Sequence, residues 1–165
     1  MTAMVDLRIG NGFDVHRFAT GRDLVLGGIK IDYPEGLAGH SDADVLVHSL
    51  IDALLGACGM GDIGKMFPDS DPRYKNISSI ILLEEVARKL AQSKITIVNT
   101  DSTIVCQEPR ISPYADSMKN AISNALGGLP VDRISIKGTT TEHLGFTGRG
   151  EGVAAFSVVL VNINP

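Results

Sequence analysis

Three of the four histidines lie in two short segments that also hold carboxylates. Asp14 and His16 are two residues apart, and apolar residues alternate with them, which favours a strand that places both side chains on one face. Catalytic zinc sites combine three protein ligands with one open position, so Asp14, His16 and His48 have the composition of such a site. A separate D-x-H pair or a single helical histidine is more often a hydrogen-bonded structural residue, and spacing alone leaves both interpretations open.

His48 lies in an expected helix that also carries Asp44 and Asp52. These residues are spaced at i, i+4 and i+8, which places them on one helix face. A metal-bound histidine usually donates its second ring N–H to a carboxylate or carbonyl, so we expect Asp44 or Asp52 to orient His48.

Residues 39–44 (Gly-His-Ser-Asp-Ala-Asp) lead directly into this helix. Backbone N–H groups and the positive end of the helix dipole form a natural anion site there, and His40 and Ser41 add side-chain donors. The alternative is an ordinary helix cap made by Ser41 or Asp42.

Residues 139–152 form a second segment suited to phosphate. Its threonine hydroxyls could contact phosphate oxygens, and Glu142 could hold a hard cation such as Mg²⁺. Arg149 lies among glycines, although a flexible glycine loop with a surface arginine is the simpler interpretation. Residues 62–71 form a further loop whose carboxylates could bind hydroxyl groups, and His143 is expected at the surface.

The composition of the 165-residue chain limits its class. A length of this order predicts one domain over residues 1–165, of which 1–6 are expected to be a flexible extension. Hydrophobic residues make up 44% and permit a buried core, whereas a net charge of −4 argues against nucleic-acid or anionic-membrane partners. Two cysteines and the lack of a leader-like start favour a cytoplasmic protein.

The hydrophobic pattern predicts an α/β (α+β) fold with a mixed sheet and helices packed on one face. Asn99 is expected to kink its strand, and Pro113 to lie in the first turn of its helix. Strands are expected over 7–10, running into a stretch over 11–16 that could also be extended, and over 24–26, 29–31, 95–106, 134–137 and 153–163. Helices are expected from about 45 to 56 or 59, 78–94 and 113–127, and loops over 61–72, 107–113 and 138–152.

Four of these segments occur together, in order, in one protein family. They are 12–16 (Gly-Phe-Asp-Val-His), 40–45 (His-Ser-Asp-Ala-Asp-Val), 62–69 (Asp-Ile-Gly-Lys-Met-Phe-Pro-Asp) and 139–152. From Leu7 to Val161 the chain closely resembles the 2-C-methyl-D-erythritol 2,4-cyclodiphosphate synthases of the non-mevalonate isoprenoid pathway.

The resemblance implies a homotrimer with active sites between neighbouring subunits. It implies that Asp14, His16 and His48 bind Zn²⁺, and that Glu142 binds Mg²⁺ or Mn²⁺ with the substrate phosphates. His40 and Thr140 correspond to the family's transition-state stabilisers. The substrate-binding positions implied are Ser41, Asp62, Gly64, Phe67, Pro68, Asp69, Ser70, Asp71, Cys106, Arg110, Ser112, Thr139, Thr141, Phe146 and Arg149.

The reaction implied is cyclisation of 4-diphosphocytidyl-2-C-methyl-D-erythritol 2-phosphate with release of CMP. The substrate's own 2-phosphate would attack the β-phosphorus, so no enzyme nucleophile is required. Two alternatives stay open: a zinc-dependent hydrolase, and a non-catalytic trimeric module that binds metal and a prenyl diphosphate. Arg149 and Glu151 near a trimer axis could make the prenyl diphosphate site, in the module or beside the enzyme's own site.

Overall fold

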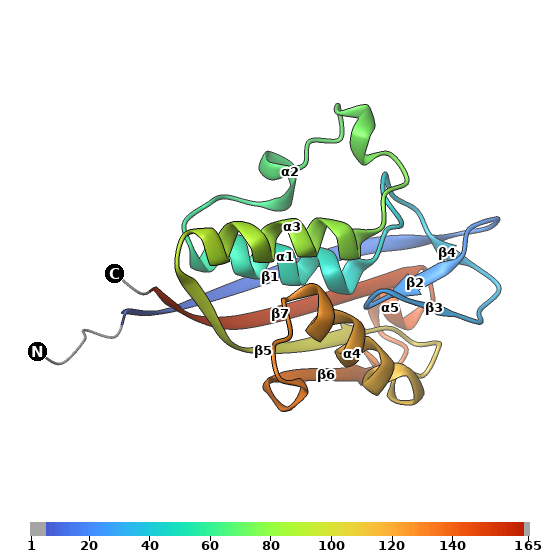
Figure 1. Ribbon diagram of the computed structural model, residues 1–165. Coiled ribbons are helices and arrows are strands. Elements are labelled where there is room, and N and C mark those ends of the chain that lie inside the picture. The colour runs from blue at the N-terminus through green and yellow to red at the C-terminus, as the bar shows by residue number, and fades with distance from the viewer. Residues whose placement is uncertain (1–5, 164–165) are drawn as a thin grey trace, which may run out of the picture.

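The computed structural model describes residues 6–163, which form a mixed five-stranded sheet in the order β4-β1-β7-β5-β6 (Figure 1). The long central strand β7 pairs antiparallel with β1 and β5, and β5 pairs parallel with β6. The mixed sheet is therefore as predicted. The strands are β1 (Asp6–Ala19), β4 (Gly36–Leu37), β5 (Ile95–Val105), β6 (Ile134–Thr139) and β7 (Gly152–Ile163).

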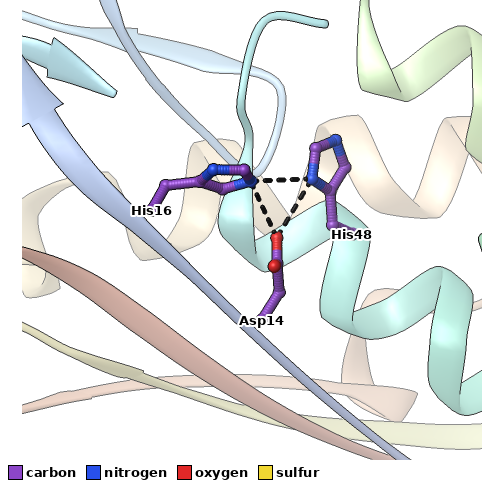
Figure 2. A group of neighbouring side chains, drawn as sticks. All are labelled: Asp14, His16 and His48. Atoms are coloured by element: carbon purple, nitrogen blue, oxygen red, sulfur yellow. Dashed lines mark hydrogen bonds and ion pairs between the residues drawn. The ribbon is translucent and has the colours of Figure 1, made fainter. Parts of the chain in front are cut away.

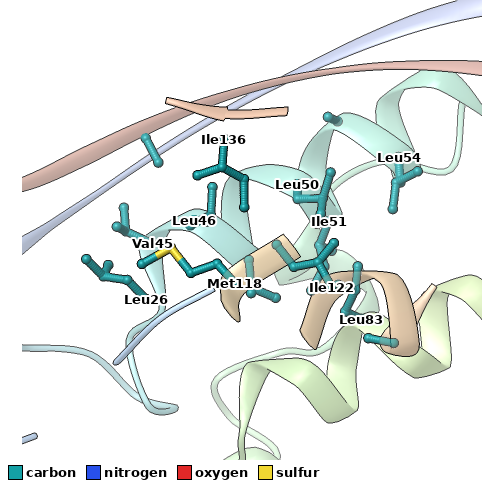
Figure 3. Packing of buried hydrophobic residues seen from close by; sticks show 14 of the residues in the cluster. Leu26, Val45, Leu46, Leu50, Ile51, Leu54, Leu83, Met118, Ile122 and Ile136 are labelled. Atoms are coloured by element: carbon teal, nitrogen blue, oxygen red, sulfur yellow. The ribbon is translucent and has the colours of Figure 1, made fainter. Parts of the chain in front are cut away.

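Three longer helices share one core over the sheet: α1 (Val45–Ala57), α3 (Ser79–Gln92) and α4 (Ala115–Ala125). Helix α1 lies on β1 and β7, while α3 packs against α1 and α4 packs against β6 and α3 (Figure 1). Figure 3 shows side chains from all three helices and from β6 meeting in this core, including Leu50, Leu83, Met118, Ile122 and Ile136. Each such side chain contributes roughly 1.5–3 kcal/mol when it leaves water.

The alternation of β1 separates two faces. Gly10, Gly12, Asp14 and His16 lie on the face that α1 covers, whereas the residues between them are directed to the other face. That other face is apolar and open to solvent: Ile9 is 73% exposed, and Phe13 packs against Phe156 of β7 with ring centroids 4.6 Å apart. A sheet face of this kind is suited to contact with another protein surface.

The hairpin of β2 (Leu24–Leu26) and β3 (Ile29–Ile31) is confirmed, as is the irregularity in β5 between Ile97 and Asn99. The short strand expected over 7–10 is longer than predicted, because β1 continues through the stretch 11–16 to Ala19. Within the described part of the chain, 3₁₀ turns also occur at Pro72–Tyr74, Ser112–Tyr114 and Val131–Arg133.

Two segments expected to be loops contain short helices, and one predicted cap is wrong. Helix α2 (Ile63–Met66) forms because the Asp62 carboxylate accepts a hydrogen bond from the Lys65 N–H. Helix α5 (Gly145–Gly148) lies in the 138–152 segment. Helix α1 is capped by Asp44, whose side chain accepts from the Val47 N–H, and not by Ser41 or Asp42.

The predicted extension over residues 1–6 lies outside the described residues except for Asp6, which begins β1. Within residues 6–163, no helix combines the length and the hydropathy needed to cross a bilayer.

Candidate active site

Asp14 and His16 from β1 and His48 from α1 bring their side chains to one point (Figure 2). Asp14 Oδ2 lies 3.0 Å from His16 Nε2 and 3.0 Å from His48 Nδ1, and these two nitrogens are 3.2 Å apart. The three atoms thus form a nearly equilateral triangle. The strand that carries Asp14 and His16 and the helix that carries His48, far apart in the sequence, therefore meet in the fold.

The donor set and its spacing fit a zinc ion. Tetrahedral zinc with bonds of about 2.0–2.1 Å separates neighbouring ligand atoms by about 3.3 Å, close to the observed triangle edges. Two imidazoles and one carboxylate match the three protein ligands that a catalytic zinc site would use. The triangle borders a pocket of about 460 Å³, because Asp14, His16 and His48 are all among the residues that line it.

The contact between β1 and α1 sets this geometry. At Gly12 the strand lies so close to the helix that an added Cβ would stand 1.9 Å from the carbonyl oxygen of Ser49. At Gly10 the same distance to the carbonyl oxygen of Ala53 would be 2.0 Å. Glycine at these two positions therefore permits the approach that places His48 beside Asp14.

Opposite charges couple the members of the triangle. Burial alone raises the pKa of Asp14, but the hydrogen bonds and charges of His16 and His48 outweigh burial and hold that pKa well below its ordinary value. Burial lowers the pKa of His48, yet the hydrogen bond and charge of Asp14, helped by Asp44 and Asp42, raise it above the ordinary value. Asp14 is thus held anionic, and the protonated form of His48 is stabilised relative to that of an isolated histidine.

The prediction that Asp44 or Asp52 orients His48 is wrong. Asp44 is fully buried and accepts hydrogen bonds from the N–H groups of Gly27, Gly28 and Val47, so it ties the β2–β3 turn to the start of α1. Burial and the charge of Asp42 nevertheless raise the pKa of Asp44 to about 6. Asp52 accepts from the Ile63 N–H. His48 Nε2 instead lies 2.8 Å from Ser79 Oγ and 3.0 Å from Ser41 Oγ.

The pocket beside the triangle brings together eight of the predicted residues. Its walls also include residues that sequence reasoning did not assign, among them Tyr74 and Leu82. The predicted residues that line it are Asp14, His16, His40, Ser41, His48, Gly64, Phe67 and Asp69.

A second pocket of about 170 Å³ lies between the segment after β5 and the end of β6. Burial, with the charge of Glu108, raises the pKa of the Cys106 thiol to about 11, so this cysteine is protonated and not a nucleophile at neutral pH. The predicted residues that line this pocket are Cys106, Arg110, Ser112, Thr139 and Thr140.

The remaining predicted residues line neither pocket. Asp62 caps α2, and Asp71 pairs with Arg73 at 2.6 Å. Glu142 is exposed, and its Oε1 accepts a hydrogen bond of 2.9 Å from Thr140 Oγ1. The other members of this group are Pro68, Ser70, Thr141, Phe146 and Arg149, and His143 is exposed as predicted.

Two further residues support the site. Arg22 donates to the carbonyl oxygens of Gly39 (2.9 Å) and Ser41 (2.6 Å), which braces the main chain on both sides of His40. Ser79 is buried at the start of α3. Neither residue is part of a sequence motif that would have identified it. Ser78 and Ser79 at the start of an expected helix indicate a helix cap and nothing about the site.

Comparison with known proteins gives a consistent result along the chain. The model of the YgbB family matches residues 7–162. The 2-C-methyl-D-erythritol 2,4-cyclodiphosphate synthase of Caldicellulosiruptor bescii is 56% identical over 154 residues, which cover 93% of this chain and 98% of that protein.

Solved structures agree with the sequence comparison. The bifunctional IspDF of Campylobacter jejuni superposes with a TM-score of 0.92 at 42% identity, covering 97% of this chain, and this chain spans 43% of that longer protein. The CDP complex of IspF from Plasmodium falciparum gives a TM-score of 0.84 at 32% identity, covering 96% of this chain and 97% of that one.

Proposed function

The chain belongs to the YgbB family of cyclodiphosphate synthases, and from this membership we propose which of its residues carry out the reaction. The protein is a phosphorus–oxygen lyase of isoprenoid precursor biosynthesis. It converts 4-diphosphocytidyl-2-C-methyl-D-erythritol 2-phosphate to 2-C-methyl-D-erythritol 2,4-cyclodiphosphate and releases CMP.

The triangle of Asp14, His16 and His48 beside the larger pocket is the observation that carries the assignment. We propose that these residues bind Zn²⁺, and that Glu142 with the substrate phosphates binds Mg²⁺ or Mn²⁺. When bound, the two cations neutralise phosphate charge and polarise the reacting diphosphate. The acidic chain, with a net charge of −4, thus needs no broad basic surface to hold its substrate.

The residues of the chain then position the phosphates and stabilise developing charge. A new bond forms between an oxygen of the 2-phosphate and the β-phosphorus, while the bond from the β-phosphorus to the oxygen of the leaving CMP breaks. His40 and Ser41, at the larger pocket, are proposed to donate hydrogen bonds to phosphate oxygens, and Thr140 is proposed to do so at the smaller pocket. Gly64, Phe67 and Asp69 are proposed to hold the erythritol part.

A homotrimer is proposed because the two halves of the predicted site lie in separate pockets of one chain. Assembly with active sites between subunits would place the smaller pocket of one chain opposite the larger pocket of the next. The exposed apolar face around Phe13 and Phe156 supports such assembly. Replacing Phe156 with glutamate should give monomers by light scattering, whereas an unchanged mass would argue against this face as the contact.

Product analysis separates cyclisation from the alternative of zinc-dependent hydrolysis. The purified protein, supplied with Zn²⁺ and Mg²⁺, is incubated with the cytidyl substrate in ¹⁸O-labelled water and followed by ³¹P NMR. A cyclic diphosphate and CMP, both free of label, are expected. An open product that carries ¹⁸O would instead indicate hydrolysis.

Two finer assignments complete the proposal. A prenyl diphosphate on the trimer axis is proposed as a ligand of Arg149, which pairs with Glu151 at 2.7 Å in the single chain. Calorimetry with a prenyl diphosphate should show binding that Arg149→Ala removes, and equal binding would exclude this residue.

A cytoplasmic location is proposed because Cys58 and Cys106 are both free thiols.

A further inference from the structure

His48 presents its two ring nitrogens to two different environments. Nδ1 faces Asp14 and His16, while Nε2 faces Ser79 Oγ at 2.8 Å. A nitrogen that binds a metal must be free of hydrogen, so Nδ1 can act as a ligand of a neutral imidazole only if Nε2 carries the proton. The Nε2–H group then needs an acceptor in a site where His48 is largely buried.

Ser79 is arranged to be that acceptor. Its hydroxyl donates a hydrogen bond to Asp42 Oδ1, and its backbone N–H donates to Asp42 Oδ2 at 2.9 Å. Because the carboxylate can only accept, the hydroxyl hydrogen of Ser79 is committed to Asp42. The oxygen of Ser79 therefore presents a lone pair to His48. The hydrogen bonds run in one direction, from His48 Nε2–H to Ser79 Oγ and from the Ser79 hydroxyl to Asp42.

Ser41 is the competing partner of His48 Nε2, at 3.0 Å. Its oxygen already accepts a hydrogen bond of 3.2 Å from the Ala43 N–H. One N–H group cannot be well aligned with both hydroxyls, and Ser79 is nearer and is wholly buried. Ser41, which lines the pocket, is therefore left to face the substrate.

We propose that Ser79 and Asp42 are positioning residues of the metal centre, which fix the tautomer and the ring orientation of His48 so that Nδ1 is directed to the metal. Asp42 precedes α1 and Ser79 begins α3, so the hydrogen bonds between these two residues also fix α3 against the helix that carries His48. The inference rests on the proposed metal site. Partners of this kind usually change metal affinity by about 10–100-fold.

The test compares Zn²⁺ affinity among full-length variants by competition with a chromophoric chelator. Ser79→Ala and Asp42→Asn should each bind Zn²⁺ about 10–100-fold more weakly than the parent protein. Ser78→Ala is the matched control, because Ser78 is the adjacent serine and makes no capping hydrogen bond through its side chain; its affinity should equal that of the parent. Equal affinity in all four proteins would overturn the proposal.

A double-mutant cycle and NMR distinguish positioning from a merely structural role. If both residues act through one series of hydrogen bonds to His48, Ser79→Ala combined with Asp42→Asn should weaken Zn²⁺ binding little more than either change alone. Losses that multiply in the double variant would contradict this shared role. In the zinc-loaded parent, ¹⁵N-resolved spectra should show a protonated, slowly exchanging Nε2 of His48. In Ser79→Ala this signal should broaden or vanish, and its persistence unchanged would also overturn the proposal.

The thermal unfolding of the metal-free variants is recorded alongside, so that loss of folding is recognised. If Ser79→Ala does not fold, the affinity of Asp42→Asn and the NMR signal of the parent still decide the question. Failure of the parent protein to bind Zn²⁺ through Asp14, His16 and His48 would refute the proposed metal site itself. Normal binding by the parent together with normal binding by Asp42→Asn and Ser79→Ala would refute the positioning role alone.

Discussion

Gly12 of β1 lies directly against the main chain of Ser49 in α1, with no room for a side chain between strand and helix. Two residues farther along the same face of β1 comes Asp14, and one residue before Ser49 comes His48. The contact between Gly12 and Ser49 and the triangle that contains Asp14 and His48 are therefore adjacent parts of the interface between β1 and α1. A change in the separation of β1 and α1 at Gly12 is transmitted to the distance between Asp14 and His48.

Gly12→Ala should accordingly weaken both folding and metal binding. A Cβ at this position would stand 1.9 Å from the Ser49 carbonyl oxygen, so the helix must move away from the strand. Overpacking of this kind typically costs about 1–3 kcal/mol, which urea unfolding of the metal-free protein would measure. Chelator competition should show weaker Zn²⁺ binding in the folded fraction.

Gly56→Ala, in the helix α1 that Gly12 contacts, is the matched control. The nearest atom to an added Cβ there is the Asn11 carbonyl oxygen at 3.8 Å, which is ordinary contact. Alanine is favoured over glycine within helices, so this variant should be more stable by roughly 0.5–1 kcal/mol with unchanged metal affinity. Equal stability losses at positions 12 and 56 would show that the close approach at Gly12 is not the cause.

His48→Ala should remove the metal and the activity together while the protein stays folded. Two remaining ligands, Asp14 and His16, hold zinc far more weakly than three. Elemental analysis after dialysis measures the metal, and circular dichroism the fold. His40→Ala is the informative comparison, because His40 lines the pocket outside the triangle and its loss should lower turnover with zinc retained. Full zinc content in His48→Ala would contradict the ligand assignment.

Zn²⁺ affinity should rise with pH through the neutral range. In the metal-free protein the pKa of His48 is raised above its ordinary value, so the folded state holds this proton more tightly than the unfolded chain does. The resulting stability is present below about pH 6.5 and is lost as the pH rises through the raised pKa. Because zinc needs the neutral ring, affinity should fall about tenfold for each pH unit below that pKa.

The pKa of Asp14 acts in the opposite direction. It is held below its ordinary value, so its contribution to the stability of the metal-free protein is present above about pH 4 and is lost in stronger acid. Zinc affinity measured between about pH 5.5 and about pH 8.5 therefore reports on histidine and not on Asp14. An affinity that does not change over this range would mean that His48 is already neutral in the metal-free protein.

The fold was predictable to the extent that local patterns determine it. The alternation around Asp14 and His16 indicated β1, and the residues Leu24 to Ile31 indicated the hairpin. The short helices α2 and α5 were not predicted, because a single turn stabilised by one cap such as Asp62 has too few residues to show a helical period.

The candidate metal-binding residues could be predicted from the sequence, but the residues that support them could not. Asp14, His16 and His48 were identified from residue type, and the fold brings them together. Asp44 was expected to orient His48 because it lies one turn away, yet it caps the helix and binds the β2–β3 turn. The actual partner, Ser79, is 31 positions away, and only the packing of α3 on α1 places it there.

Thr140→Val should slow the chemical step while metal and substrate still bind. Thr140 Oγ1 donates to Glu142 Oε1 at 2.9 Å and accepts from the Glu142 N–H at 3.2 Å, so in the single chain its hydroxyl is oriented by the proposed cation ligand. Valine keeps the shape and removes the hydroxyl. Losing one such donor typically costs about 3 kcal/mol, or roughly a hundredfold in kcat, with KM changed little.

Thr140→Ser is the matched control for that substitution, because it restores the hydroxyl and removes only the methyl group. Its kcat should lie close to that of the parent protein. A loss shared by the serine and valine variants would point to packing of the methyl group in the pocket shared with Arg110 and Ser112. Unchanged turnover in Thr140→Val would reject a hydrogen bond from Thr140 in the transition state, and the stabilisation of charge would then rest on His40 and the bound cations.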